Sequence, residues 1–168
     1  EEGALFSYKA MFSRESRDLA TAVYSKDDRA GIYIIDLQTG ETKNYLSEQE
    51  GITSVWVEDE YIYLTAYSMD GETTGSVYCV NADAELVWEY TLDGMPDDIM
   101  AFGAMSSDKL AFIQYSKLIV ISKEDGNFIC ETDCGRDIVN YAAYTESNTL
   151  SYMTRGGEFH YFMTDSNE

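Results

Sequence analysis

The feature that most constrains the fold is a pattern that recurs about every forty residues along the chain. In each copy an apolar run enters a short polar turn, as it does in residues 33–40. When Asp36, Asn81 and Ser122 are taken as equivalent, the copies lie 45 and 41 residues apart, and Met163 follows 41 residues later. A Tyr-Ser pair also ends the apolar run that comes before the aligned segment. The tyrosines of these pairs are Tyr24, Tyr67 and Tyr115. Self-similarity at this period indicates a protein built from repeated structural units.

Within each copy, β-branched and aromatic residues dominate and the apolar positions follow a period of two. Residues 52–57 and 61–67 are clear examples, and this pattern indicates β-strands. Short polar turns separate the runs, and their glycines supply the positive φ angles of tight hairpins: Gly40, Gly71, Gly94, Gly126 and the pair Gly156-Gly157. The connections are too short for parallel βαβ units, which need a crossover of about a dozen residues or more.

Four copies, each with room for four strands, predict an all-β fold of about four β-propeller blades of antiparallel strands. We expect a single domain over residues 1–168, with blades at about residues 4–46, 52–91, 98–132 and 137–163. The last blade stops before a fourth strand, which leaves an edge of unpaired backbone groups. Residues 3–7 could supply that strand and close a four-blade ring. Alternatively, the four blades are half of a larger ring, completed by another chain or by a missing part of the protein.

The turn after the predicted third strand resembles the repeat of quinoprotein-type propellers. That repeat has an apolar strand, an Asp, a Thr-Gly turn and then a tryptophan that docks between blades. The matching positions are Asp36, Thr39, Gly40 and, one residue late, Tyr45 in the first copy, Asn81 and Trp88 in the second, and Asp125, Gly126 and Cys130 in the third. The outline also resembles WD-type propellers. The resemblance implies a propeller fold and, among non-enzymatic members, a scaffold role. No cofactor-binding residue carries over from this resemblance. The enzymes of the quinoprotein family are cofactor-bearing rings of eight blades, whereas this chain has at most four.

The charge of the chain limits its partners. The formal net charge is −20, and the 65 residues from Asn44 to Asp108 contain 14 acidic residues but no lysine or arginine. Such a field repels nucleic acids and attracts a basic protein or a divalent cation. No apolar stretch approaches the roughly 18 residues of a membrane-spanning helix. The start at Glu1 and the propeller resemblance favour a location outside the cytoplasm, either extracellular, at the cell surface or periplasmic.

The residue types that usually carry chemistry are sparse. Cys79, Cys130 and Cys134 make neither a disulfide framework nor a zinc site, although Cys130 and Cys134 could bridge across a turn. The alternative is that the cysteines are small buried hydrophobes. His160 is the only histidine, and no nucleophile is evident for it to activate, so we expect no catalytic residue.

Acidic residues recur at the predicted turns, in the groups Asp27-Asp28, Glu58-Asp59-Glu60, Asp97-Asp98 and Glu124-Asp125. Solvated hairpin tips explain them most simply. Paired carboxylates also suit glycoside hydrolysis, and several converging oxygens suit calcium, but the chain has no EF-hand loop.

These observations predict a non-catalytic module that presents a face of loops to a protein or ligand, with a basic protein as one fit. The candidate binding residues are Trp56, in a predicted first strand near the channel, and Asp59, Asp97 and Asp98 at predicted turns. No cofactor is expected, with calcium as an alternative. Two other functions stay open: a carbohydrate-active hydrolase or lyase with paired carboxylates, and a calcium-dependent adhesive surface. A homodimer joined through open blade edges is a further alternative.

Overall fold

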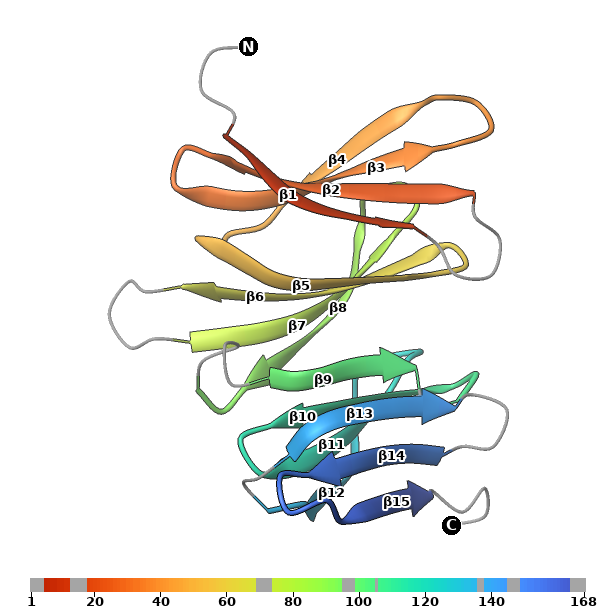
Figure 1. The fold of residues 1–168 in the computed structure, drawn as a ribbon. Coiled ribbons are helices and arrows are strands. Elements are labelled where there is room, and N and C mark those ends of the chain that lie inside the picture. The colour runs from red at the N-terminus through yellow and green to blue at the C-terminus, as the bar shows by residue number, and fades with distance from the viewer. Residues whose placement is uncertain are drawn as a thin grey trace. The chain divides into compact units, whose positions relative to one another are not determined.

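The structure, a computed structural model, describes residues 5–12, 18–68, 74–94, 99–104, 106–135, 138–144 and 149–163. In these residues the chain forms fifteen β-strands and no helix, so the predicted all-β class is confirmed. The strands make four antiparallel sheets, and in each sheet they lie side by side in chain order (Figure 1). Each sheet is therefore a simple meander, as a propeller blade requires.

The bounds of the strands follow the predicted copies. The first sheet holds β1 (Leu5–Phe12), β2 (Leu19–Lys26), β3 (Arg29–Asp36) and β4 (Thr42–Leu46). The second holds β5 (Gly51–Glu58), β6 (Tyr61–Ser68), β7 (Thr74–Asn81) and β8 (Leu86–Leu92). The third holds β9 (Ile99–Ala104), β10 (Lys109–Gln114), β11 (Lys117–Ser122) and β12 (Phe128–Asp133). The fourth holds β13 (Ile138–Tyr144), β14 (Thr149–Thr154) and β15 (Phe159–Met163).

The chain divides into two compact units, Glu1–Pro96 and Asp97–Glu168. The first unit contains the first and second sheets, and the second unit contains the third and fourth. A single domain that unites all four sheets stays a prediction.

The sequence repeat coincides with a structural one. Asp36, Asn81, Ser122 and Met163 are each the last residue of the third strand of their sheet. The alignment made on sequence therefore identifies equivalent positions in all four sheets. Within the described residues, β15 is the outermost strand of the fourth sheet.

The expected role of residues 3–7 is wrong. Leu5 and Phe6 belong to β1, where they pair with Ser25 and Tyr24 of β2 in their own sheet. The neighbouring antiparallel strand is the closest partner along the chain, so β1 completes the first sheet and not the last. The register shifts between Phe6 and Ala10, which obscures the period of two in this segment. Residues 3 and 4 lie outside the described residues.

Each sheet has two faces that the repeat distinguishes. One face carries the residues that lie two and four positions before the end of the third strand, and we call it the leading face. We call the opposite face the trailing face. In the first sheet, Ile32 and Ile34 mark the leading face, and Tyr33 and Ile35 mark the trailing face. Because side chains alternate along a strand, the assignment for one strand extends to its paired neighbours.

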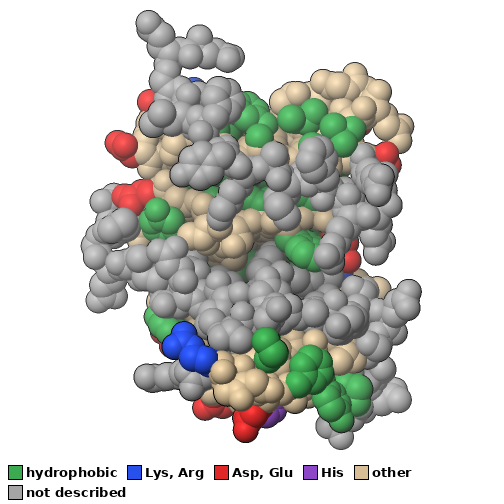
Figure 2. All heavy atoms as spheres, viewed as in Figure 1, with side chains coloured by type: hydrophobic (Ala, Val, Ile, Leu, Met, Phe, Trp, Pro, Cys, Tyr) green, Lys and Arg blue, Asp and Glu red, His purple; other side chains and the backbone are tan. Residues whose placement is uncertain are grey.

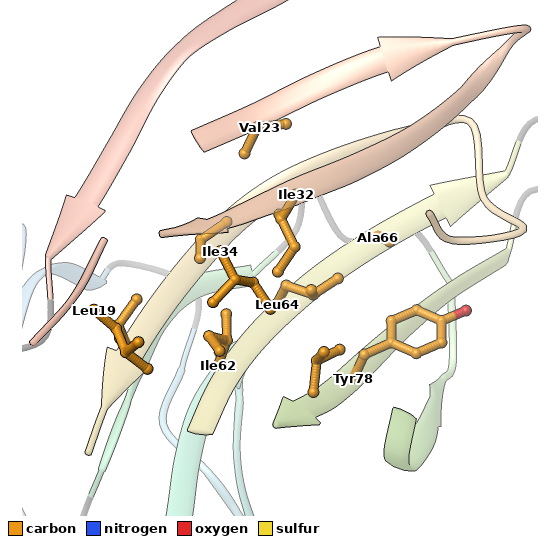
Figure 3. Packing of buried hydrophobic residues seen from close by; sticks show 11 residues of the cluster. Leu19, Val23, Ile32, Ile34, Ile62, Leu64, Ala66 and Tyr78 are labelled. Atoms are coloured by element: carbon orange, nitrogen blue, oxygen red, sulfur yellow. The ribbon is translucent and has the colours of Figure 1, made fainter. Parts of the chain in front are cut away.

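The core of the first unit lies where the first sheet's leading face meets the second sheet's trailing face (Figure 3). Ile32 and Ile34 are 0% and 2% exposed, and they lie opposite Ile62, Leu64 and Ala66 of β6, each 0% exposed. Burying an aliphatic side chain of this size contributes about 1.5–3 kcal/mol relative to leaving it in water. The junction therefore holds the two sheets together.

The second unit repeats this arrangement with different side chains. Leu118 and Val120, on the leading face of the third sheet, are both 0% exposed. They belong to one core cluster with Leu150 and Tyr152 of β14 in the fourth sheet. A leading face packs on a trailing face in both units.

The predicted turns are present where the structure describes them. Gly40, Gly94, Gly126 and Gly157 have φ angles of 75°, 107°, 72° and 82°, as expected. Gly156 does not have a positive φ, so the turn between β14 and β15 needs only one of its two glycines for this purpose, and Gly71 lies outside the described residues. Asp27 and Asp28, between β2 and β3, both have positive φ (52° and 59°), which identifies a type I′ hairpin turn.

Candidate functional site

Several turns of the first unit lie at one end of its two sheets. In the first sheet, Asp18 precedes β2, and residues 37–41 join β3 to β4. In the second sheet, Asp59 and Glu60 join β5 to β6, and residues 82–85 join β7 to β8. In an antiparallel meander, the turn between strands one and two and the turn between strands three and four share one end of the sheet. These segments are therefore brought together.

Two adjoining hollows lie among these turns, with volumes of about 220 and 330 Å³, and they share Leu19 and Ala82. We call them together the acidic groove. Its lining residues are Asp18, Leu19, Ile34, Asp36, Glu41, Lys43, Asp59, Glu60, Ala82 and Asp83. Six of these are carboxylates, and Lys43 is the one cation in the described lining. Figure 2 shows acidic side chains, in red, at the margins of the first two sheets.

Asp36 holds one rim of the groove in shape. Its Oδ1 accepts hydrogen bonds from the backbone N–H groups of Gln38 and Thr39, each at 2.8 Å. These two donors stabilise the charged form and keep the pKa of the Asp36 carboxyl below its usual value. Asn81 makes the equivalent turn in the second sheet, where its Oδ1 accepts from the N–H groups of Asp83 and Glu85. The repeat thus places a side-chain acceptor at the same point of both rims.

Lys43 connects the two sheets across the groove. Its Nζ lies 2.6 Å from Oδ1 of Asp83, forty residues away, and 4.0 Å from Oε1 of Glu41. The hydrogen bond to Asp83 raises the pKa of Lys43, and the nearby carboxylates add to that effect. Both partners are substantially exposed, so solvent screens the pair and it contributes little to stability. Its main effect is on the charge of the groove, because it neutralises one of the six carboxylates.

Asp18 braces the same rim from the other side. The Nε2 of Gln38 donates to Oδ1 of Asp18 at 2.8 Å, and the backbone N–H of Leu37 donates to the Asp18 carbonyl at 2.7 Å. The third sheet repeats the backbone contact, since the N–H of Lys123 donates to the carbonyl of Asp108 at 2.9 Å. This turn geometry therefore belongs to the structural repeat, and its presence alone does not indicate a function.

The predicted site residues are only partly brought together. Asp59 lines the groove, at the tip of the β5–β6 turn with a φ of 50°. Trp56 is half-buried in β5, opposite Tyr63, and does not line the groove. Asp97 and Asp98 lie outside the described residues. The other carboxylates of the groove were not among the predicted site residues.

Catalytic and metal-binding arrangements find little support in the described part of the chain. No group of three or more His, Cys, Asp or Glu residues there could hold a metal ion. The pKa values of Asp36, Asp108 and Asp125 are all lowered by hydrogen bonds, whereas a glycosidase general acid needs a raised one. His160, in the fourth sheet, stacks on Tyr152 at 5.1 Å and lies 3.4 Å from Glu158.

The three cysteines are free thiols, so the bridge between Cys130 and Cys134 is not formed. Cys79 is fully buried in β7, and burial raises the pKa of its thiol to about 12. Cys134 is 7% exposed, and burial raises its pKa as well. Both therefore behave as packed core residues and not as nucleophiles.

No protein-family model matches the chain, and no curated protein sequence matches it. Its structure is similar to that of the WD40 domain of SCAP from fission yeast, with a TM-score of 0.63, 16% identity and 98% of this chain covered. It is also similar to a eukaryotic initiation factor, with a TM-score of 0.61, 11% identity and 95% of this chain covered. The chain spans only 44% and 42% of the lengths of these two proteins.

The chain therefore has the fold of part of a WD40-type β-propeller, as the sequence predicted at the level of fold. The quinoprotein part of the resemblance stays a prediction. The described residues include no helix that is both long and apolar enough to cross a membrane.

Proposed function

We propose that this chain is a non-catalytic binding module whose acidic groove receives a basic segment of another protein. One observation carries the proposal: six carboxylates from four turns line one groove, and Lys43 is the one cation in its described lining. Negative potential from several turns adds up in a concave site, so a cationic partner is drawn there faster and held longer.

The shape and composition of the groove support the same partner. Leu19, Ile34 and Ala82 contribute apolar surface between the carboxylates. A lysine or arginine side chain has an apolar stem and a charged end, so it matches such a lining. The hydrogen bonds made by Asp36 and Asp18 fix the rim before a partner arrives, which reduces the entropy lost on binding.

A binding measurement with synthetic peptides tests the proposal. We expect a labelled Lys/Arg-rich peptide to bind and a Glu-rich peptide of the same length to show no binding. The double variant Asp59→Asn and Glu60→Gln should bind the basic peptide roughly fivefold more weakly, a loss of about 1 kcal/mol. Asn tolerates the positive φ at position 59, so the turn should keep its shape.

The matched control is the double variant Asp27→Asn and Asp28→Asn. It also removes two charges from a two-residue hairpin tip with positive φ, but at the opposite end of the first sheet. We expect it to bind the peptide as the unmodified chain does. Equal weakening by both double variants would show that only net charge matters, and the groove proposal would then be wrong.

Two other functions are less well supported. The hydrolase hypothesis requires a carboxyl with a raised pKa. The pKa values of Asp36, Asp108 and Asp125 are lowered instead. The calcium hypothesis requires oxygen ligands that converge on one point, and no three acidic side chains among the described residues are placed to hold a metal ion together, those of the groove included.

A further inference from the structure

The two hollows of the acidic groove differ in the charges that line them. The larger hollow, of about 330 Å³, has three carboxylates and no cation in its described lining: Asp18, Asp59 and Glu60. We call it the Asp59 hollow. The smaller hollow, of about 220 Å³, also has three carboxylates, but Lys43 lies among them. We call it the Lys43 hollow. One hollow therefore lacks a described cation of its own, whereas the other already holds one.

Lys43 shows which chemical group the smaller hollow binds. Its Nζ donates a hydrogen bond to Oδ1 of Asp83 at 2.6 Å and lies 4.0 Å from Oε1 of Glu41. The hydrogen bond to Asp83 raises the pKa of Lys43, so the amine is a charged ammonium group at neutral pH. Carboxylates form such charge-assisted hydrogen bonds with ammonium and guanidinium groups alike. A basic side chain of a partner would therefore meet the same carboxylates in the same way.

The structural repeat does not require a lysine at position 43. Lys43 pairs with Ile34, two residues before the end of the third strand of the first sheet. Trp88 and Cys130 hold the same place in the second and third sheets. Trp88 is 7% exposed, and Cys130 packs against the core of the second unit. The position is packed in those two sheets, and in the first sheet it carries a cation that lines the groove.

Stability does not explain the contact between Lys43 and Asp83 either. The two side chains are 38% and 69% exposed, so solvent screens their attraction. A competing cation can replace Lys43 at little cost to the fold. Glu41, whose Oε1 is 4.0 Å from Nζ, offers the displaced ammonium group a second carboxylate.

We infer that the Lys43 hollow is a subsite for one lysine or arginine side chain of the partner, and that Lys43 fills it in the free chain as an intramolecular competitor. The inference rests on the proposed function, because it requires a basic segment to enter the groove. The two hollows share Leu19 and Ala82, so neighbouring side chains of one short segment reach both.

The competition makes the groove selective. A segment with one basic side chain gains the carboxylates of the Asp59 hollow and leaves Lys43 in place. A segment with two basic side chains also displaces Lys43 and binds Asp83. The intramolecular contact thus lowers affinity for every basic segment, and most for those that need both hollows.

The test is the binding of a labelled Lys/Arg-rich peptide, followed by fluorescence anisotropy at a salt concentration of about 0.1 M. Lys43→Met keeps an unbranched side chain and removes the competing charge. We expect it to bind the peptide roughly fivefold more tightly than the unmodified chain does. It should also melt at the same temperature, because the exposed pair contributes little to stability. Lys43→Gln should behave in the same way and serves as a second variant.

The matched control is Lys26→Met. It makes the same change in formal net charge, from −20 to −21, and it also alters an exposed lysine of the first sheet. Lys26 lies at the other end of β2 from Leu19, roughly 23 Å away at about 3.3 Å per residue. That distance exceeds the screening length of about 10 Å at this salt concentration. We expect Lys26→Met to change the affinity less than twofold.

Two further backgrounds separate a subsite from a local charge effect. In Asp83→Asn the subsite has lost the carboxylate that the partner would bind, so adding Lys43→Met should increase the affinity by no more than about twofold. In the double variant Asp59→Asn and Glu60→Gln, which alters only the other hollow, the gain from Lys43→Met should remain roughly fivefold.

The outcomes distinguish this inference from the proposed function. If the unmodified chain binds the peptide and Lys43→Met binds it no better, or no better than Lys26→Met does, the proposed function stands and the inference is wrong. Equal gains from Lys43→Met with and without Asp83 would also overturn it, because Lys43 would then act only through its charge. If neither the unmodified chain nor Lys43→Met binds the peptide, both proposals fail.

Discussion

The first and fourth sheets carry the same repeat position in opposite environments. Ile32 and Ile34 are buried in the junction with the second sheet, whereas their equivalents Phe159 and Tyr161 are each two-thirds exposed. The backbone pattern is the same in both sheets, as the pairing of the second and third strands shows. The comparison teaches that a single sheet of this kind cannot hide both of its faces, so burial at this position depends on a neighbouring sheet.

The largest expected effect on stability comes from replacing the side chain at this repeat position with alanine, once in the first sheet and once in the fourth. Ile32→Ala should lower the free energy of unfolding by about 2–5 kcal/mol, because it leaves a cavity in a packed junction. Phe159→Ala should change it by no more than about 0.5 kcal/mol, because the side chain is largely in water.

Urea denaturation of the two variants beside the unmodified chain gives the two values. Similar losses for Ile32→Ala and Phe159→Ala would mean that the fourth sheet is covered within one chain, and the comparison would fail.

A smaller difference is expected at glycines of the second and fourth sheets. A Cβ at Gly51 would overlap the ring of Tyr67, which lies over this glycine from the paired strand. Gly51→Ala should therefore cost about 1–3 kcal/mol through overpacking. Gly156, in the β14–β15 turn, has ordinary φ, and the nearest atom to an added Cβ is 3.8 Å away.

Gly156→Ala is therefore the matched control, and it should stay within about 0.5 kcal/mol of the unmodified chain. Thermal melts of the two variants make the measurement. A cost at Gly156 equal to that at Gly51 would show that the fourth sheet is packed as tightly as the second.

The smallest expected effect is on the pH dependence of stability. The pKa of Asp36 is lowered in the folded chain, so its contribution to stability is fully present above the unfolded value of 3.8 and is lost as the pH falls through the folded value. Asp36→Asn keeps an acceptor for the N–H groups of Gln38 and Thr39 but cannot titrate. Melting temperatures of the variant should fall less steeply below pH 4 than those of the unmodified chain. Parallel curves would contradict this assignment.

Sequence reasoning reached the repeat because its signal is local. The ends of the third strands at Asp36, Asn81, Ser122 and Met163 follow from an apolar run that meets a polar turn, and both features lie within a few residues of each other. Turn glycines such as Gly40 and Gly126 were equally accessible, because only a few backbone conformations permit so tight a reversal.

The features that sequence reasoning missed depend on contacts between distant residues. The groove forms because the turns of two sheets lie close together and Lys43 contacts Asp83. No local sequence pattern predicts a contact between residues so far apart in the chain. Asp59 was selected as an acidic turn residue, but Asp18 and Asp36 were not. The exposure of Phe159 and Tyr161 could not be predicted from the sequence either. An alternating aromatic strand has the same sequence pattern whether or not another sheet covers it.

Amide hydrogen exchange followed by nuclear magnetic resonance tests the central claim, that four equivalent sheets differ at the outer edge of the fourth. The strands β3, β7 and β11 each lie between two partners, so their amides should exchange slowly along the whole strand. In β15, alternate amides should exchange fast, because in the described residues only β14 pairs with it. Uniformly slow exchange along β15, or fast exchange at every second amide of β3, would contradict the account.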